Sequence, residues 1–556
     1  MDNWKSATFH SGPFVGRTRE ISGLINTYQT VQRGQTKIVI LKGVVGIGKS
    51  RLATEFLKKA QLLGAHILQA RPFGVYACPP YQPIIEALSS YYPQPPHSSE
   101  IIAEQLYDSV AQAVQQLAEQ RPVVLFIDNL TLADTATLDM LYAIGQRWLA
   151  NNTSVLLLLA FRQEALVTSP TLAEWFTRIE QDLRASSVTL SHLKVEHVTQ
   201  FIRQLVNKPA DASDVSLETI GRWLFAETHG LPLYMVEVLD TLLDHNILSI
   251  STQADGKWGI DLAASALSAS KVQSVLQPNM RSVIRARLTL LSAHASTLLA
   301  TGAVLARPFS FEQVRLIADL EDHDGCAALD EILARHLLEE VGDGYFFTHD
   351  IIREIVYTEI PEAQQRGLHQ STLQVLEGEW SHDPSHAAEL AYHAEAAGLW
   401  EQAFHRYVAA ADYALQQRAV KNAIDLYEVA GKQFLTTRSL QATLTAIPAS
   451  ALQHHHLQLG LAYESVGKKE QAHSIYSNMV LQARRAGLVE YVYVGLNHLA
   501  RLINDYKVDF AEAQELRRQM LQLINDVEED GDIAVRAETE MHIAQLSLYR
   551  FDVISV

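Results

Sequence analysis

The sequence Gly43-Val44-Val45-Gly46-Ile47-Gly48-Lys49-Ser50 fits the pattern G-x-x-x-x-G-K-[ST] at every fixed position. The β-branched run at 37–41 predicts a buried strand before it, and residues 51–63 have helical spacing without glycine or proline. In this context the backbone N–H groups of the loop turn inward around a phosphate, and the helix dipole adds positive charge. Lys49 then reaches the outer phosphates, and Ser50 ligates Mg²⁺. The sequence therefore predicts a nucleotide site; the alternative, a glycine-rich turn without a ligand, is disfavoured by the flanking elements.

The composition is that of a globular protein with several domains. A chain of 556 residues exceeds the size of one hydrophobic core, and about 150 residues per domain predicts three or four domains. No apolar run approaches the ~18 residues that span a bilayer, the N-terminus lacks a signal segment, and two cysteines are too few for a disulfide framework. We therefore expect a cytoplasmic protein that does not bind a membrane. The net charge of −18 also disfavours nucleic acid as a partner of this segment.

Polar residues follow two further strands that the sequence predicts. The apolar run at 121–127 ends at Asp128 and Asn129, and the run at 154–161 is followed by Arg162. Carboxyl ends of parallel strands share one edge of a sheet, so these side chains are expected near the phosphate loop. There Asp128 organises Mg²⁺, and Arg162 is placed to sense a γ-phosphate. A strand-ending acid and an exposed surface arginine are the structural alternatives.

Asn129 stands where related ATPases usually carry a second acid that polarises the attacking water. An amide orients water but cannot accept its proton, so we expect slow hydrolysis. Asp134 is close enough in sequence to compensate in part, but an acid at a helix N-terminus explains it equally well.

Beyond residue 192 the pattern becomes mostly helical. Gly230 ends one helix and Pro232 starts the next, and the polar stretch at 249–269 predicts a connector or a weak hairpin. Three helices and a hairpin signal at Asp343-Gly344 predict a winged helix, after which Asp350 is suited to cap a helix. Further on, a small-residue and aromatic pattern has tetratricopeptide spacing: Leu459, Gly460, Tyr463, Ala472 and Tyr476.

We therefore expect a multidomain protein that begins with an α/β P-loop domain. Its sheet should have about five parallel strands, with further strands at 66–70 and 187–190. The expected domains are a nucleotide-binding domain at 1–192, a small helical domain at 193–270, a winged helix at 271–360 and a tetratricopeptide-like α-solenoid at 361–556.

In this order the segments resemble a signal-transduction ATPase with numerous domains (STAND), which combines an AAA-like or NB-ARC-like module with tetratricopeptide repeats. Phe14-Val15-Gly16-Arg17 is similar to the family's motif on the adenine side, and residues 43–50 and Asp128 are similar to its two Walker motifs. Arg162 is similar to its sensor arginine. The resemblance covers nearly the whole chain.

Two elements of the helical part also carry the resemblance. Gly230-Leu231-Pro232 resembles a G-x-P element whose proline stacks near adenine. Thr348-His349-Asp350 resembles an M-H-D element whose histidine contacts the β-phosphate in the resting state with ADP. The departures from the family pattern are Thr348 for methionine, Asn129 for the second acid, and Leu132 where tryptophan is frequent.

The resemblance implies a site for ATP or ADP with Mg²⁺. The expected catalytic group is Lys49, Asp128, Asn129 and Arg162, and the expected metal ligands are Ser50 and Asp128. The residues expected to bind the nucleotide are Phe14, Val15, Gly16, Arg17, Gly43, Gly46, Ile47, Gly48, Lys49, Ser50, Arg51, Pro232 and His349.

The implied function is a switch in regulatory or defence signalling. ADP would join the nucleotide domain to Pro232 and His349 in a closed form, whereas ATP would favour an open form that self-associates. The repeats would sense a protein or a small molecule. The sequence ends without a polar capping helix, so we expect a fragment whose effector lies beyond Val556.

Two other classes remain open. One is a repeat-based scaffold with a vestigial, structural nucleotide site, which Asn129 favours and the intact Lys49, Ser50 and Asp128 oppose. The other is a processive AAA motor, which needs a hydrolytic acid and an arginine finger that the sequence does not identify.

We predict ATP turnover below the ~1 s⁻¹ low end of typical enzymes, because Asn129 cannot act as a base. Asn129→Asp should accelerate phosphate release in a steady-state assay. Rapid turnover in the wild type, unchanged by the substitution, would mean that another residue activates the water.

Overall fold

The computed structural model of the chain describes residues 12–73, 79–89, 91, 103–205, 215–244, 248–252, 258–262, 279–342, 344–380, 383–435, 447–506, 515–516, 518–520 and 522. The chain divides into two compact units between residues 381 and 382. None of the helices within these ranges is long and apolar enough to cross a lipid bilayer. The first unit holds the phosphate loop and is described first.

A five-stranded parallel sheet organises the first part of this unit, in the order β2-β3-β4-β1-β5. The strands are β1 (Lys37–Gly43), β2 (His66–Ala70), β3 (Val123–Ile127), β4 (Val155–Arg162) and β5 (Ser186–Thr189). All five residues of β3 are buried, as expected for a parallel strand covered on both faces. The predicted α/β fold with about five parallel strands is confirmed.

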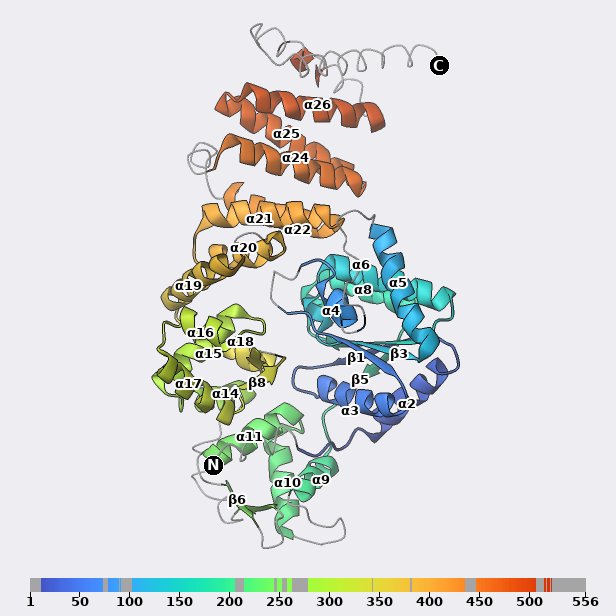
Figure 1. Ribbon diagram of the computed structural model, residues 1–556, viewed down its shortest axis with the longest axis vertical. Helices are drawn as coiled ribbons and strands as arrows, with labels where there is room; N and C mark the ends of the chain where they lie inside the picture. Colours follow the sequence, from blue (N-terminus) through green and yellow to red (C-terminus); the bar gives the residue numbers. More distant parts are fainter. Residues whose placement is uncertain are drawn as a thin grey trace. The chain divides into compact units, whose positions relative to one another are not determined.

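Helices cover both faces of this sheet (Figure 1). On one face, α2 (Thr18–Val31) and α3 (Lys49–Leu62) pack against alternate side chains of the strands, such as Val39 and Phe126. The other face is covered by α4 (Gln82–Ser89), α5 (Ala103–Gln120), α6 (Thr135–Ala150) and α8 (Pro170–Asp182). The short η2 (Leu130–Leu132) and α7 (Ala165–Thr168) complete what we call the sheet domain.

A small helical domain follows. It consists of α9 (Val195–Leu205), α10 (Val215–Thr228) and α11 (Pro232–Asp244), which share one apolar core that includes Phe201 and Val238. The antiparallel strands β6 (Leu248–Thr252) and β7 (Trp258–Leu262) then form a hairpin, so the polar stretch is more than a connector. Residues 253–257 and 263–269 of this stretch lie outside the described residues.

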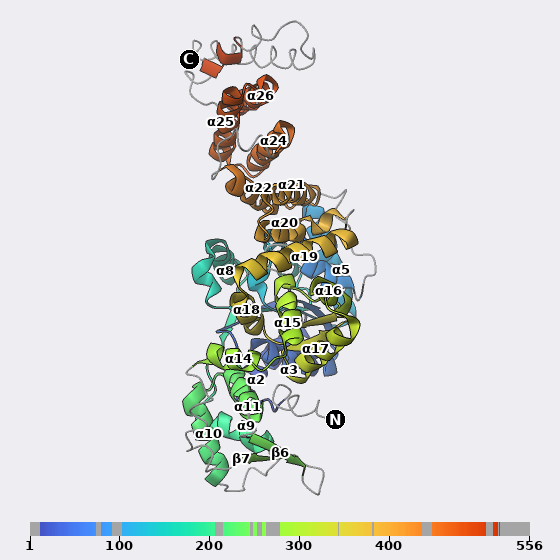
Figure 2. The same ribbon diagram turned by 90° about the vertical axis from the view of Figure 1, so that its left-hand side faces the viewer.

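The predicted winged helix is present after this domain (Figure 2). Its elements are α14 (Met280–Leu288), α15 (Ala293–Leu305), α16 (Phe311–Ile317), α17 (Asp322–Ala334), β8 (Leu338–Val341), β9 (Gly344–Phe347) and α18 (Asp350–Glu359). The wing is the antiparallel β8–β9 hairpin, which Phe309 extends by a bridge to Tyr345. Asp343, half of the hairpin signal, lies outside the described residues.

Helix α19 (Glu362–Trp380) packs against α15 and α16, so it stands with the winged helix in the first unit. From the sequence we placed the start of the repeats at residue 361, so α19 was counted as part of them. The domain limits at 192, 270 and 360 stay predictions.

A buried ion cluster joins the small helical domain to the winged helix. Arg287 of α14 is 2% exposed, and its Nη1 lies 2.5 Å from Oε2 of Glu237 on α11. Asp240 and Asp244, about one helical turn apart on the same face of α11, complete the acidic side. Burial alone would lower the pKa of Arg287, but the three acids outweigh it and the pKa is raised. The arginine stays charged, and its loss would leave buried acids without their counter-ion.

The second unit is a series of helices, each of which packs on the next in chain order (Figure 2). Within the described residues they are η3 (Pro384–His386), α20 (Ala387–Ala396), α21 (Trp400–Gln416), α22 (Val420–Leu435), α24 (Ala449–Ser465), α25 (Lys469–Ala486) and α26 (Val489–Tyr506). Gly460 on α24 lies so close to α25 that a Cβ there would stand 2.3 Å from the Tyr476 ring. The small-residue and aromatic pairing that the sequence pattern predicted is therefore present.

A tyrosine-to-acid bond recurs along these repeats. Tyr407 donates to Glu395 at 2.5 Å, and Tyr476 donates to Glu464 at 2.6 Å. In both cases the tyrosine lies 12 residues after the acid, on the second helix of a pair. The bond repeats with the helix pair and fixes the end of one helix to the middle of the next.

Two adjacent histidines are enclosed in α24. His455 is 1% exposed, and its Nε2 lies 2.8 Å from the carbonyl oxygen of Tyr427. Burial, with a contribution from His456, lowers the pKa of His455 from 6.5 to about 3. The folded chain thus binds this proton less readily than the unfolded chain does.

The contribution of neutral His455 to the free energy of unfolding of the second unit should therefore be complete above about pH 6.5. It should decrease as the pH drops from there towards 3. The slope attributable to His455 is about 1.4 kcal/mol per pH unit. Urea unfolding between pH 7.5 and 5 should show a smaller slope in His455→Gln than in the wild type. The exposed His405→Gln is the matched control and should leave the slope unchanged. Equal slopes in all three proteins would contradict this account.

Candidate nucleotide site

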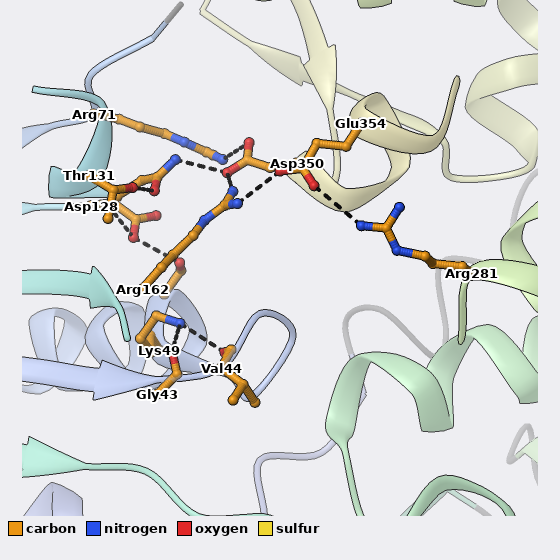
Figure 3. A network of polar contacts seen from close by, with 12 residues as sticks. Gly43, Val44, Lys49, Arg71, Asp128, Thr131, Arg162, Arg281, Asp350 and Glu354 are labelled. Carbon is orange, nitrogen blue, oxygen red and sulfur yellow. Dashed lines mark hydrogen bonds and ion pairs between the residues drawn. The ribbon is translucent and has the colours of Figure 1, made fainter. Parts of the chain in front are cut away.

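The phosphate loop connects β1 to α3 at the carboxyl edge of the sheet. Gly48 has φ of +95°, a left-handed conformation that favours glycine, and α3 begins at the next residue, Lys49. The Lys49 ammonium donates to the carbonyl oxygens of Gly43 at 2.8 Å and Val44 at 2.9 Å (Figure 3). The loop therefore curls around its own lysine, with a helix N-terminus at its end, which is the arrangement that binds phosphate.

Ser50 and Asp128 meet beside this loop. The Ser50 hydroxyl donates to Oδ1 of Asp128 at 3.0 Å, although the residues are 78 positions apart. A hydroxyl and a carboxylate oxygen fit Mg²⁺, which takes one or two protein ligands and completes its octahedron with phosphate oxygens and water. Among the described residues no group of three or more His, Cys, Asp or Glu side chains could hold a metal. A Mg²⁺ ion held by Ser50 and Asp128 would take its remaining ligands from phosphate oxygens and water.

A cavity of about 770 Å³ opens over the loop, with walls from the sheet domain, the small helical domain and the winged helix. Most of the predicted site residues line it: Phe14, Val15, Arg17, Gly46, Ile47, Gly48, Lys49, Ser50, Arg51, Asp128, Asn129, Arg162, Pro232 and His349. Gly16 and Gly43 are the predicted residues that do not. Pro232 and His349 thus share a cavity with the phosphate loop, and their contacts with a nucleotide stay predictions.

The small helical domain docks directly on the loop. The backbone N–H of Leu233 donates to the carbonyl oxygen of Gly46 at 3.1 Å, and a Cβ at Gly46 would lie 2.7 Å from Cβ of Leu233. Gly230 has φ of +73°, and a Cβ there would lie 2.0 Å from the carbonyl oxygen of Leu193. Glycine at 230 is therefore required for the close approach that brings Pro232 to the cavity wall.

The motif at residues 14–17 supports the phosphate loop through hydrogen bonds. Arg17 is 5% exposed and donates to the carbonyl oxygens of Ile47 at 3.1 Å and Ser191 at 2.8 Å. It also pairs with Glu20 at 3.3 Å. A Cβ at Gly16 would stand 2.6 Å from the ring of His197, so this glycine packs against α9. Arg17 and Gly16 thus hold the loop and the small helical domain together.

Burial lowers the pKa of Lys49 from 10.5 to about 8. The acids Glu164, Asp128 and Asp350 raise it in part, whereas Arg162 lowers it further. Lys49 is therefore mostly charged at neutral pH and begins to lose its proton slightly above it.

Residues that follow three neighbouring strands converge on one carboxylate of the winged helix. Arg71, directly after β2, donates to Oδ1 of Asp350 at 2.9 Å, and Arg162, at the end of β4, donates to Oδ2 at 2.6 Å (Figure 3). The side-chain amide of Asn129, after β3, donates to the same Oδ2 at 2.9 Å. Burial alone would raise the pKa of Asp350, but Arg71 and Arg162 outweigh it and the pKa is lowered. Asp350 is thus a charged acceptor at neutral pH.

The structural alternative for Asp350, a helix cap, is not what the structure has. The N-cap of α18 is His349, without a side-chain capping bond, and the Asp350 carboxylate faces the sheet domain instead. Asp134, by contrast, does cap α6 by accepting from the N–H of Thr137 at 2.9 Å. The alternative of a helix-terminal acid is therefore the correct one for Asp134.

The sequence did not point to Arg71 or Glu354. Glu354 of α18 accepts from Nη1 of Arg162 at 2.9 Å and lies 4.0 Å from Arg281 of α14 (Figure 3). The Arg71 guanidinium also lies 5.4 Å from the centre of the Phe346 ring on the wing. Arg71 could have been found by the argument used for Arg162, because it directly follows a parallel strand; Glu354 has no such signal.

Thr348 is the departure from methionine noted above. Its hydroxyl donates to the carbonyl oxygen of His336 at 2.9 Å, and its N–H donates to that of Leu337. These bonds fix the segment between the wing and α18, which positions the two residues that follow.

Comparison with known proteins supports the assignment of the sheet domain. Residues 13–158 match the family described as the AAA ATPase domain. This segment contains the phosphate loop and Asp128, so the predicted P-loop ATPase domain is confirmed for this part of the chain, and nucleotide binding follows from it. The remainder of the chain lies outside the match. No curated protein matches the sequence.

Solved structures are similar at low identity. One is a STAND protein with a tetratricopeptide repeat sensor from Pyrococcus horikoshii, 13% identical, with 93% of this chain and 85% of that chain covered and a TM-score of 0.39. Another is the Walker-type ATPase of Pyrococcus abyssi, 11% identical, with 62% and 96% covered and a TM-score of 0.30. A third is the Drosophila ORC bound to DNA, 13% identical, with 62% and 87% covered and a TM-score of 0.32. Such low values establish no shared activity.

We predict that nucleotide affinity falls above about pH 8, by up to tenfold per pH unit, because Lys49 binds phosphate only when protonated. Lys49→Ala should abolish binding of ADP and ATP in titration calorimetry, and Lys49→Arg should remove the pH dependence of any binding that it retains. Lys58→Ala, on the exposed side of α3, is the control and should bind as the wild type does. Equal affinity in the wild type and Lys49→Ala would refute the assignment.

Proposed function

We propose that the chain is a nucleotide-dependent switch of the STAND class, in which ADP with Mg²⁺ favours a closed first unit and ATP favours an open one. The observation that carries the proposal is the single cavity walled by the phosphate loop, Pro232 of the small helical domain and His349 of the winged helix. A ligand that contacts all three walls stabilises the closed arrangement more than the open one. Such differential affinity is what shifts a two-state equilibrium.

The carboxyl edge of the sheet supplies the sensing element in this proposal. Arg162 lines the cavity that contains Lys49 and is at the same time paired with Asp350 and Glu354 of the winged helix. Burial alone would lower the pKa of Arg162, but these two acids raise it above its ordinary value, so the arginine stays charged. Because Arg162 contacts both the nucleotide cavity and the winged helix, a change in the ligand that fills the cavity can change the contact with the winged helix.

Slow hydrolysis fits such a switch better than it fits a motor. Asn129 is 7% exposed, and its side chain is engaged with Thr131 and Asp350. An amide held in this way is not a base for water. The lifetime of the bound nucleotide would then set the lifetime of each state.

The second unit is proposed to receive the stimulus. Its paired helices form a tetratricopeptide-like array, an architecture that presents extended surfaces to protein or small-molecule partners. On stimulation the open form would self-associate. The alternative, a scaffold with a structural nucleotide site, differs from the switch because its assembly does not depend on the nucleotide.

We predict that His349→Ala weakens ADP more than ATP, by about 10- to 150-fold if the histidine donates a charge-assisted bond to phosphate. ADP release measured by stopped-flow should quicken, and light scattering should show more of the large assemblies. His323→Ala, on a winged-helix residue that is 94% exposed, is the matched control and should change neither. If the ADP off-rate and the size distribution of His349→Ala are those of the wild type, the closed-state proposal loses its main support.

A further inference from the structure

Asn129 is the residue for which the sheet domain offers no catalytic explanation, and its side-chain amide donates to Asp350 of the winged helix. We propose that Asn129 is the latch that couples the two domains: its amide takes the place of an acid so that position 129 can bind the Asp350 carboxylate. The inference rests on the proposed nucleotide switch and names the residue pair that sets its balance. Asn129 is thus a positioning residue for the winged helix.

The orientation of the amide is fixed by its two partners. Asp350 is ionised and only accepts hydrogen bonds, so the group that faces its Oδ2 at 2.9 Å must be the NH₂ of Asn129. The carbonyl oxygen of the amide then faces the Thr131 hydroxyl, which donates to it at 2.6 Å. Both ends of the side chain are therefore used.

The backbone at this position suits asparagine. Asn129 has φ of 53° and ψ of 47°, the left-handed region in which asparagine is enriched among residues with a side chain. Its N–H donates to Oδ1 of Asp128 at 3.0 Å, the same oxygen that accepts from Ser50. The latch is thus bonded directly to the carboxylate that we assign to Mg²⁺, and a change at one is felt at the other.

An acid at position 129 cannot form this contact. Aspartate is close to asparagine in shape, so its carboxylate would lie at hydrogen-bond distance from the carboxylate of Asp350. Two carboxylates that close cannot both be ionised without strong repulsion. An acid at position 129 therefore weakens the contact with the winged helix, which Arg71 and Arg162 still hold, whereas the amide strengthens it.

Arg162 makes the latch responsive to the nucleotide. It pairs with the same Oδ2 of Asp350 that Asn129 holds, and it lines the cavity with Lys49. When an additional phosphate draws Arg162 away, Asp350 retains Arg71 and Asn129, so the strength of the Asn129 bond decides whether the winged helix stays docked.

The test is a double-mutant cycle on the full chain with saturating ADP and Mg²⁺, so that no hydrolysis contributes. The variants are Asn129→Asp, Asp350→Asn and the two together, and the readout is hydrogen–deuterium exchange of peptides from residues 344–359. We expect each single variant to speed exchange in these peptides by roughly 10- to 100-fold, the size of a lost charged hydrogen bond. In the double variant an asparagine at 350 can donate to an aspartate at 129, so exchange should return towards the wild-type rate.

Asn152→Asp is the matched control, because Asn152 is also left-handed but exposed, on the loop between α6 and β4. It should leave exchange at residues 344–359 unchanged. The latch is refuted if Asn129→Asp exchanges as the wild type does, if the double variant is no slower than both single variants, or if exchange rises equally throughout the sheet. In parallel, the affinities for ADP and for ATP are measured on the assembled and on the unassembled wild-type protein. If each nucleotide binds the two forms with similar affinity, the switch itself is refuted, whatever the cycle shows.

Discussion

The contact between the winged helix and the sheet domain centres on one carboxylate, that of Asp350, which is bound by residues from the ends of three adjacent strands. A parallel sheet places the carboxyl ends of its strands along one edge. Its topology alone therefore brings together polar residues that are far apart in the sequence. The phosphate loop ends β1 at the same edge. The nucleotide cavity and the docking site of the winged helix are therefore neighbours for a topological reason, and each can influence the other.

A second polar contact joins the other two walls of the cavity. Arg287 of the winged helix is buried against Glu237 and its acidic neighbours on α11, whose first residue is Pro232. Removing one partner of such a buried pair is costly, because an uncompensated charge stays behind. The small helical domain and the winged helix are thus tied by charges shielded from water, whereas the contact between the winged helix and the sheet domain is partly open, with Asp350 17% exposed. The contact between the winged helix and the sheet domain is therefore the one that a soluble ligand can reach.

The sequence predicted the parts of the site that depend on local pattern. The phosphate loop, the strand that ends at Asp128, and Arg162 after β4 all follow from motifs a few residues long, and the structure has them side by side. Pro232 and His349 required a family resemblance, because the small helical domain and the winged helix must fold over the loop before either comes near it.

The docking contacts were not predictable in this way. Arg71 and Asp350 are 279 residues apart, and nothing in either segment indicates the other. A helix cap was the local alternative for Asp350, and the family resemblance gave a role only to His349, so the interdomain role of Asp350 was missed. Asn129 looked like a weakened catalytic position because its partner lies 221 residues away. A local departure from a motif acquires its physical meaning only when the domain that contacts it is known.

The most direct test of the account is the distance between the sheet domain and the winged helix with each nucleotide. Cys326 is an exposed thiol on α17, and Leu62, at the end of α3, is 89% exposed. With Cys78→Ser and Leu62→Cys, spin labels at 62 and 326 report this distance by pulsed electron paramagnetic resonance. The account predicts one narrow distribution with ADP and Mg²⁺ and a longer, broader one with a slowly hydrolysed ATP analogue. The same distribution with both nucleotides would contradict it.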